Sequence, residues 1–174
     1  GPLTVTITSS SGSSGDTVNS STLSYTATFS STVSDFTIGD ITVTGTADDS
    51  SPAASNFAGS GTTYTFDVEV STSGTVIVDI AADAATNTSE NGNSASNTYT
   101  LTVDLPPSVT ITSSSGSSGD TINSSTLSYT ATFNESVSNF TIEDITVTGT
   151  ADGSSPAASN FAGSGTTYTF DVVK

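Results

Sequence analysis

The sequence predicts an all-β protein built from antiparallel β-sandwiches, and two observations carry this prediction. Apolar residues alternate with Ser and Thr at a period of two, which is typical of strands that bury one face. Almost the same segment then occurs twice, at 5–68 and at 109–172, with an offset of 104 residues. A sandwich of seven short strands has about this length, so we expect tandem immunoglobulin-like domains.

The first three strands follow from the alternation and its one interruption. Residues 4–8 and 22–29 alternate without a break, and the second run places a Leu, a Tyr, an Ala and a Phe on the same face. Residues 36–45 change phase at Gly39. This change predicts either a bulge within one strand or a turn between two short strands.

The other four strands are bounded by turn residues. A short strand at 56–58 leads through the tripeptide Gly-Ser-Gly into a strand at 63–70, as in a hairpin. A Ser-Gly turn precedes the strand at 75–81, and the last strand is 97–103. The inward positions of all seven strands form the predicted core, which includes Tyr25, Phe36, Phe66, Val78 and Leu101.

The repeat sets the predicted domain boundaries. The first domain covers 1–104, residues 105–108 form a linker, and the second domain covers 109–174. The linker contains a Pro-Pro pair, which cannot donate to a ladder and therefore ends strand pairing. Only seven aligned positions differ between 5–68 and 109–172, and six of the seven changes involve polar residues or Gly. The second copy lacks a counterpart of its last two strands, so we expect an incomplete sandwich there.

The composition excludes several classes of function. The chain has 17 acidic residues and one basic residue, Lys174, for a formal charge of −16, and it has no His or Cys. Nucleic-acid binding and attraction to anionic membranes both need clustered Lys and Arg. Zinc, haem and iron–sulfur sites lack their nitrogen and sulfur ligands, and a Ser nucleophile lacks a His base. No apolar run is long enough for membrane insertion. We therefore expect a non-catalytic protein, whose remaining metal chemistry is that of calcium.

Three stretches resemble the bacterial immunoglobulin-like repeats, or extender modules, of large RTX-type surface adhesins. They are LSYTATFSSTVSDFTIGDITVTG at 23–45, TYTFDVEVSTSGTVIVDIAADAATN at 63–87 and NTYTLTVDLPPSVTIT at 97–112. The resemblance covers the whole chain except the missing end of the second copy. It implies an extracellular spacer of a cell-surface adhesin, whose partners are neighbouring repeats of the same protein and which calcium rigidifies.

The calcium candidates fall into two groups on the predicted strand order. The first group lies in the acidic loop, residues 82–96, which resembles the family's loop but carries an Asn at 87 and a Glu at 90 where that loop has a carboxylate and a Gly. The second group lies in loops that would meet near the linker. Together the candidate ligands are Asp83, Asn87, Glu90, Asn91, Asp16, Asp48 and Asp104. The alternative is that these residues only shape turns and keep the surface soluble.

Other functions compete with the spacer as interpretations of this sequence. The main alternative is a subunit or fragment of an extracellular filament or surface layer that assembles by β-strand exchange through the truncated copy, giving a homo-oligomer. We expect the second copy to be completed by strands that it does not own, either from another chain or from the permuted first copy. An ice-binding face, a glycosidase and a lectin-like site are each disfavoured, because the sequence offers no short regular Thr repeat, no aromatic subsite and no single distinct tip domain.

Overall fold

The computed structural model describes residues 1–174, apart from the side chain of Asp49. The chain divides into two compact units, Gly1–Pro106 (unit 1) and Pro107–Lys174 (unit 2). The division falls inside the linker expected at 105–108. The N–H of Leu105 donates to Ser73 Oγ at 2.9 Å, which ties Leu105 to unit 1. The N–H of Ser108 donates to Asn134 Oδ1 at 2.8 Å, which ties Ser108 to unit 2.

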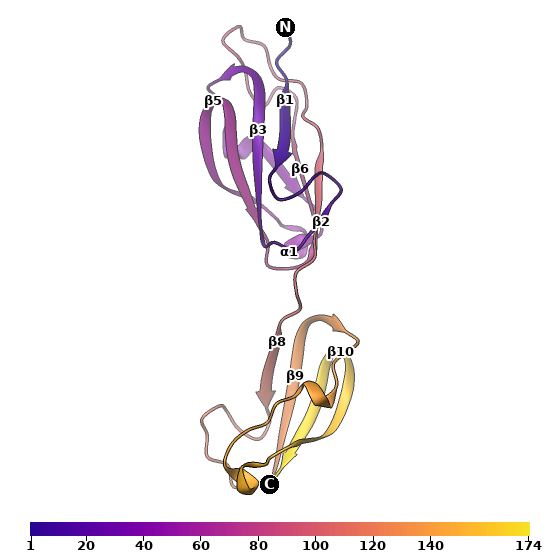
Figure 1. The fold of residues 1–174 in the computed structure, drawn as a ribbon. Helices are drawn as coiled ribbons and strands as arrows, with labels where there is room; N and C mark the ends of the chain where they lie inside the picture. Colours follow the sequence, from indigo (N-terminus) through magenta and orange to yellow (C-terminus); the bar gives the residue numbers. More distant parts are fainter. The chain divides into compact units, whose positions relative to one another are not determined.

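Unit 1 is a sandwich of two sheets (Figure 1). One sheet has the order β1-β3-β5, and the other has the order β2-β7-β6-β4. All pairs are antiparallel except β2 and β7, which are parallel. The all-β sandwich predicted from the sequence is therefore confirmed. The strands are β1 (Val5–Ser9), β2 (Thr17–Val18), β3 (Thr22–Val33), β4 (Ile41–Thr44), β5 (Ala54–Glu69), β6 (Gly74–Ile80) and β7 (Tyr99–Val103).

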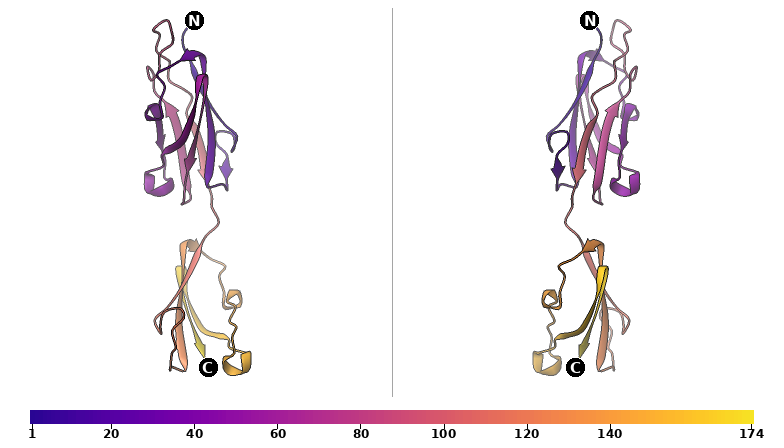
Figure 2. Two further views of the ribbon diagram at one scale, coloured as in Figure 1. Left: turned by 90° about the vertical axis from the view of Figure 1, so that its left-hand side faces the viewer. Right: turned by 90° about the vertical axis from the view of Figure 1, so that its right-hand side faces the viewer.

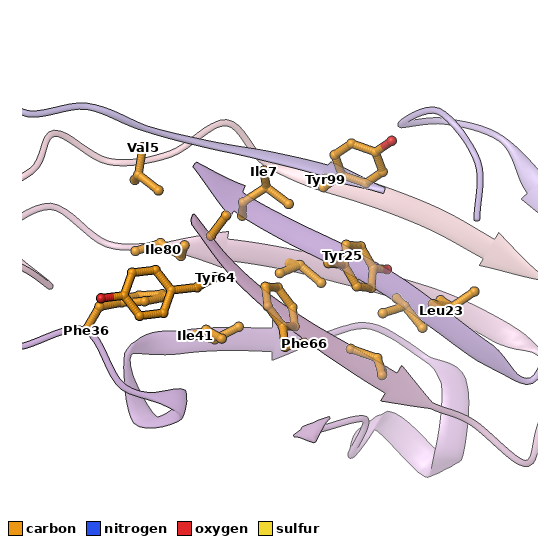
Figure 3. Packing of buried hydrophobic residues seen from close by; sticks show 14 of the residues in the cluster. Val5, Ile7, Leu23, Tyr25, Phe36, Ile41, Tyr64, Phe66, Ile80 and Tyr99 are labelled. Atoms are coloured by element: carbon orange, nitrogen blue, oxygen red, sulfur yellow. The ribbon is translucent and has the colours of Figure 1, made fainter. Parts of the chain in front are cut away.

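The core of unit 1 lies between these two sheets (Figure 3). The alternation identified in the sequence determines which side chains point inward, because successive residues of a strand face opposite sides. Tyr25 of β3 stacks on Phe66 of β5 with ring centroids 5.2 Å apart. It also meets the edge of Tyr99 of β7 across the sandwich, at 5.9 Å. The five residues predicted for the core are all buried: Tyr25, Phe36, Phe66, Val78 and Leu101.

Strand β5 contains the predicted hairpin. The extended segment doubles back on itself. A hydrogen bond shows this, because the Nδ2 of Asn56 donates to Asp67 Oδ2 at 2.9 Å although the two residues are eleven apart in the sequence. Phe57 stacks on Tyr64 across the same fold, with centroids 5.6 Å apart. The reversal uses Gly59, which has a φ of 127° and lies so close to the backbone of Thr63 that a Cβ would overlap it.

The strand expected at 36–45 is shorter than predicted. Residues Ile38–Asp40 form a 3-10 turn (η1), and only Ile41–Thr44 pair with β6. The turn forms because Asp40 Oδ2 accepts from both the N–H and the hydroxyl of Thr37, at 2.7 and 3.0 Å. The structure thus has a turn, as one of the two alternatives predicted, but only one short strand, which follows the turn, and none before it. One helical turn, α1 (Ala47–Ser50), follows in a region expected to be loop.

Unit 2 contains a single three-stranded sheet, with the order β10-β9-β8. The strands are β8 (Val109–Ser113), β9 (Thr126–Val137) and β10 (Ala158–Val173), and the 3-10 turns are η2 (Ile142–Asp144) and η3 (Ala151–Ser154). The chain between β9 and β10 runs along one side of this sheet as coil and short turns (Figure 2). Within the described part of unit 2 no second sheet is present, so the copy predicted to be incomplete is half of a sandwich.

Candidate functional site

The acidic loop of unit 1 is shaped by two asparagine side chains. Asn93 is only 1% exposed; its Oδ1 accepts from the N–H of Ala85, and its Nδ2 donates to the carbonyls of Ala81 and Ser94. Asn87 closes the tip, where its Oδ1 accepts from two backbone N–H groups at 3.0 Å. Buried polar groups are costly unless they are hydrogen-bonded, and the buried amide of Asn93 has a partner for both of its polar atoms. The Nδ2 of Asn87 donates to Ser31 Oγ outside the loop, at 3.3 Å. Hydrogen bonds of these two side chains thus give the loop a defined shape.

Asp35 fixes this loop to the neighbouring turn, and the sequence analysis did not single it out. Its carboxylate accepts from the hydroxyl of Thr86 at 2.6 Å and from the Thr86 N–H at 2.9 Å. The Thr86 hydroxyl and then the Thr86 N–H hold the pKa of the Asp35 carboxyl below its ordinary value. The repeat held a signal for this role, since the second copy has Asn139 at the equivalent position and has no acidic loop.

Asp48 plays the same part at the other end of unit 1. Its Oδ1 accepts from the N–H of Ser71 at 2.7 Å and from the N–H of Thr72 at 3.0 Å, and both hydroxyls add further bonds. The carboxylate therefore caps the turn between β5 and β6. These bonds, that of the Ser71 N–H first, hold the pKa of Asp48 below its ordinary value. Asp48 has a φ of 51°, a conformation that Asp and Asn tolerate better than most residues.

The predicted calcium ligands are distributed over separate places. Asp16 Oδ2 accepts from the N–H of Ser13, and its carbonyl accepts from Thr102, two residues before Asp104 on the chain. Asp48 serves the turn at Ser71. The remaining candidates belong to the acidic loop: Asp83, Asn87, Glu90 and Asn91.

Hydrogen bonds within the protein already engage several of the predicted calcium ligands. Calcium takes six to eight oxygen ligands, several of them carboxylates. Among the described residues no three carboxylates gather into a group that could hold a metal ion. The Oδ1 atoms of Asn87 and Asp48 already accept two and four hydrogen bonds. Calcium binding therefore stays a prediction from the sequence, and no step below depends on it.

The inner face of the sheet in unit 2 exposes apolar side chains whose equivalents in unit 1 are buried. Ile7 is 1% exposed in unit 1, whereas its equivalent, Ile111, is 62% exposed. Val5 and its equivalent Val109 are 4% and 50% exposed. The sequences around these residues are the same, so the difference comes from the absent second sheet. Exposed apolar surface of this kind usually marks an interaction site.

A hollow of about 720 Å³ lies on this open face. It is lined by residues of β8, of the following Ser/Gly loop and of β9, including Ile111, Gly116, Ile122, Leu127 and Tyr129. In unit 1 the equivalent loop is covered by β7. There the Tyr99 hydroxyl donates to the carbonyl of Gly12, and Leu101 packs over the same glycine. The hollow is thus the position that a β7 strand would fill.

Comparisons with known proteins add little to this geometry. No family model matches the sequence, and no curated protein matches it. Among solved structures, the chain is similar to the N-terminal part of the bacterial S-layer protein SbsC, with 14% identity and a TM-score of 0.38. The match covers 75% of this chain and 41% of that one. No described helix has the length and apolarity needed to cross a membrane.

Proposed function

We propose that the chain is a non-catalytic structural spacer, part of an extracellular cell-surface protein, in which unit 1 carries tension from one end to the other. One observation carries this proposal: the chain enters and leaves unit 1 at opposite ends of the sandwich (Figure 1). Leu3 bridges to Asn93 in the acidic loop, and Leu105 bonds to Ser73 in the turn before β6. Strand β6 separates these two places, and its seven residues span about 23 Å.

The last strand of unit 1, β7, is bonded to β2, and the chain just before it is bonded to the backbone of β1. Strand β2 pairs with β7 in parallel, and the N–H of Asp104 donates to the carbonyl of Val18 at 2.8 Å. The side chain of Asn97, just before β7, forms two hydrogen bonds with the backbone of Ile7 in β1. Its Oδ1 accepts from the Ile7 N–H at 2.8 Å, and its Nδ2 donates to the Ile7 carbonyl at 3.0 Å. A pull on the two ends acts along these strands and loads their hydrogen bonds together. Unit 1 is therefore suited to resist extension.

The chemistry of the surface supports a passive role. Ser and Thr make up 70 of the 174 residues, and several of their hydroxyls form hydrogen bonds with the backbone of β3 and β7. The two carboxylates in unit 1 with lowered pKa values, Asp35 and Asp48, serve turns and have no catalytic partner beside them. Perturbed carboxylates can mark active sites, but structural hydrogen bonds perturb them as well.

Mechanical stretching of the full chain by its two termini tests the proposal. We expect unit 1 to unfold in one step at a distinct force peak, followed by an extension that matches about 100 unfolded residues at roughly 3.5 Å each. Asn97→Ala removes the two hydrogen bonds with Ile7 and should lower the peak force. Asn56→Ala is the matched control, because it also removes an amide hydrogen bond, in the hairpin of β5 and away from the loaded strands. Gradual extension of unit 1 without a peak would contradict the proposal.

A second candidate function has its own observation. The open face of unit 2 favours a subunit or fragment of a filament or surface layer that assembles by strand exchange. Such assembly would make the mass of the particle in solution rise with protein concentration. A spacer needs only contacts along one chain and would keep the mass of a monomer. Sedimentation of the full chain over a wide concentration range separates the two functions.

A further inference from the structure

We propose that the peptide bond between Asn91 and Gly92 is a site of self-modification, at which Asn91 loses ammonia and becomes aspartate or isoaspartate. The proposal goes beyond the spacer function and does not rest on it. An asparagine reacts most easily when glycine follows it, because glycine has no Cβ to hinder attack by its own nitrogen. The Asn-Gly pair occurs once in the sequence, at 91–92 in the acidic loop.

The reaction needs no cofactor and no reactant other than water. The backbone nitrogen of Gly92 attacks Cγ of Asn91. The N–Cγ bond forms, the Cγ–Nδ2 bond breaks, and ammonia leaves with the proton of the Gly92 N–H. Water then opens the cyclic imide. Cleavage of the new N–Cγ bond leaves aspartate, whereas cleavage of the original peptide bond leaves isoaspartate, in which the main chain runs through Cγ. Either product adds one carboxylate to the loop.

The attacking nitrogen is free of hydrogen bonds. Gly92 lies opposite Thr86 in an isolated antiparallel bridge. The bonds of this bridge are made on either side of the pair, by the N–H groups of Asn87 and Asn93, both at 3.1 Å. In this type of pair the N–H of each residue points away from the opposite segment. None of the described residues accepts a hydrogen bond from the Gly92 N–H, so this nitrogen is available for the attack.

The side chain that is attacked is also unrestrained. Asn91 is exposed near the tip of the loop, and its amide forms no hydrogen bond within the described part of the chain. The other two asparagines of the loop differ in this respect. Asn93 is bonded through both of its polar atoms, and Asn87 Oδ1 accepts from two backbone N–H groups. The loop thus holds two of its asparagines in place and leaves the third free to turn toward its own backbone.

Packing explains why a glycine follows Asn91. A Cβ on residue 92 would overlap Oδ1 of Asp83, whose carboxylate lies against the glycine. The loop therefore requires at 92 the residue that makes Asn91 reactive. Serine follows Asn19 and Asn123, which are exposed like Asn91 and hold equivalent positions in the two units. These two asparagines are internal standards for the reaction.

Isoaspartate would disturb the place where the chain enters unit 1. It makes the main chain one carbon longer just before Gly92, and Asn93 then loses its register in the loop. Asn93 is 1% exposed and bridges to Leu3, and the N–H of Ser94 donates to the Leu3 carbonyl at 2.9 Å. The amide of Ser94 therefore reports on the modification. Aspartate keeps the length of the main chain and should leave this amide protected from hydrogen exchange.

The test ages the full chain in buffer and follows each asparagine by mass spectrometry of proteolytic peptides. We expect the peptide with Asn91 to change from amide to acid about tenfold faster than the peptides with Asn19 or Asn123. An isoaspartate-specific methyltransferase should label the aged chain and leave the fresh chain unlabelled. In the fraction that carries isoaspartate, and only there, the Ser94 amide should exchange faster than in the fresh chain.

Asn91→Gln is the decisive variant, because its longer side chain would have to close a larger and less favourable ring. The side chain at 91 is exposed, so the fresh variant should melt like the parent, and it should lose the methyltransferase label after ageing. Asn19→Gln is the matched control and should be labelled like the parent.

Four results would overturn the proposal. They are an unchanged Asn91 in a folded chain when a synthetic peptide of residues 85–97 reacts, equal rates at the three exposed asparagines, a label on aged Asn91→Gln, and a Ser94 amide that isoaspartate leaves protected. None of these measurements depends on how unit 1 behaves under force, so the spacer function and this modification can fail independently.

Discussion

At the scale of single residues, the core of unit 1 contains one polar group without a partner. The hydroxyl of Tyr25 is buried, and none of the described residues forms a hydrogen bond with it. Burial, and then the neighbouring Tyr99, raise the pKa of this phenol. The ring itself is well placed between Phe66 and Tyr99. The hydroxyl therefore adds a desolvation cost to a side chain whose ring stabilises the core.

Tyr25→Phe should stabilise unit 1. The change keeps the ring contacts and removes an unsatisfied hydroxyl, whose burial costs about 1–3 kcal/mol. Thermal unfolding followed by circular dichroism measures the effect. Tyr99→Phe is the matched control, because the Tyr99 hydroxyl donates to the carbonyl of Gly12 and its removal should destabilise. A lower melting temperature for Tyr25→Phe would show that its hydroxyl has a partner in solution.

Asp48→Asn should lower the melting temperature of unit 1 at neutral pH, because it replaces a charged acceptor of four hydrogen bonds. The pKa of Asp48 is lower in the folded protein than its ordinary value of 3.8. The stabilisation is therefore present above pH 3.8 and is lost as the pH falls through the folded pKa. In melting curves, the difference between variant and parent should be largest at neutral pH and should shrink as the pH falls below 3.8.

Asp152→Asn gives the control for this measurement. Asp152 is the equivalent of Asp48 in unit 2, where the chain ends before any counterpart of Ser71 and Thr72. Its φ is the same, 51°, so the substitution tests the charge without the turn that it caps. An equal loss of stability from both variants would contradict the role assigned to Asp48.

At the scale of elements, the sequence predicted those strands in which apolar and polar residues alternate over the whole length of the strand. The strands at 22–29, 63–70 and 75–81 were found with small shifts of their ends, and β3 extends to Val33 through an irregularity after Thr28. The two-residue strand β2 was missed, because its strand character comes only from pairing with β7. The alternation could not predict the turn at Thr37, which depends on a side-chain bond to Asp40.

The candidate site was less predictable than the fold. Asp48 was selected as a metal ligand, and it caps a turn. Asp35 and Asn93, which organise the acidic loop, were not selected. Residue type alone does not distinguish a carboxylate that binds a cation from one that accepts backbone N–H groups. The open face of unit 2 was expected, since a missing pair of strands is visible in the repeat.

The identical segments at 41–44 and 145–148 provide a direct test of tertiary control over strand formation. Amides in 41–44 should exchange slowly because β4 pairs with β6, and amides in 145–148 should exchange quickly because no strand lies beside them. The control is β3 against β9, whose central amides at 24–28 and 128–132 are paired in both units. Equal protection at 41–44 and 145–148 in the dilute chain would mean that unit 2 is already completed.

At the scale of the whole molecule, charge is the property that both units share. The chain carries −16 with a single Lys, so like charges on its surface repel one another at low ionic strength. Any cation reduces this repulsion by screening. A rise in stability with salt is therefore expected without a specific site, and a test for calcium must separate binding from screening.

The resemblance to adhesin repeats predicts that calcium binds the acidic loop, and melting curves test it. Millimolar calcium should raise the melting temperature of unit 1 above its value in EDTA. Binding to the native state at 100 times the dissociation constant would add roughly 2.7 kcal/mol to the free energy of unfolding.

Magnesium at the same ionic strength supplies the screening control, since it prefers a stricter octahedral site. The double variant Asp83→Asn, Glu90→Gln should lose the calcium effect, whereas Glu135→Gln in unit 2 should keep it. Identical curves in calcium and magnesium would leave only screening, and the acidic loop would then be stabilised by Asn87, Asn93 and Asp35 alone.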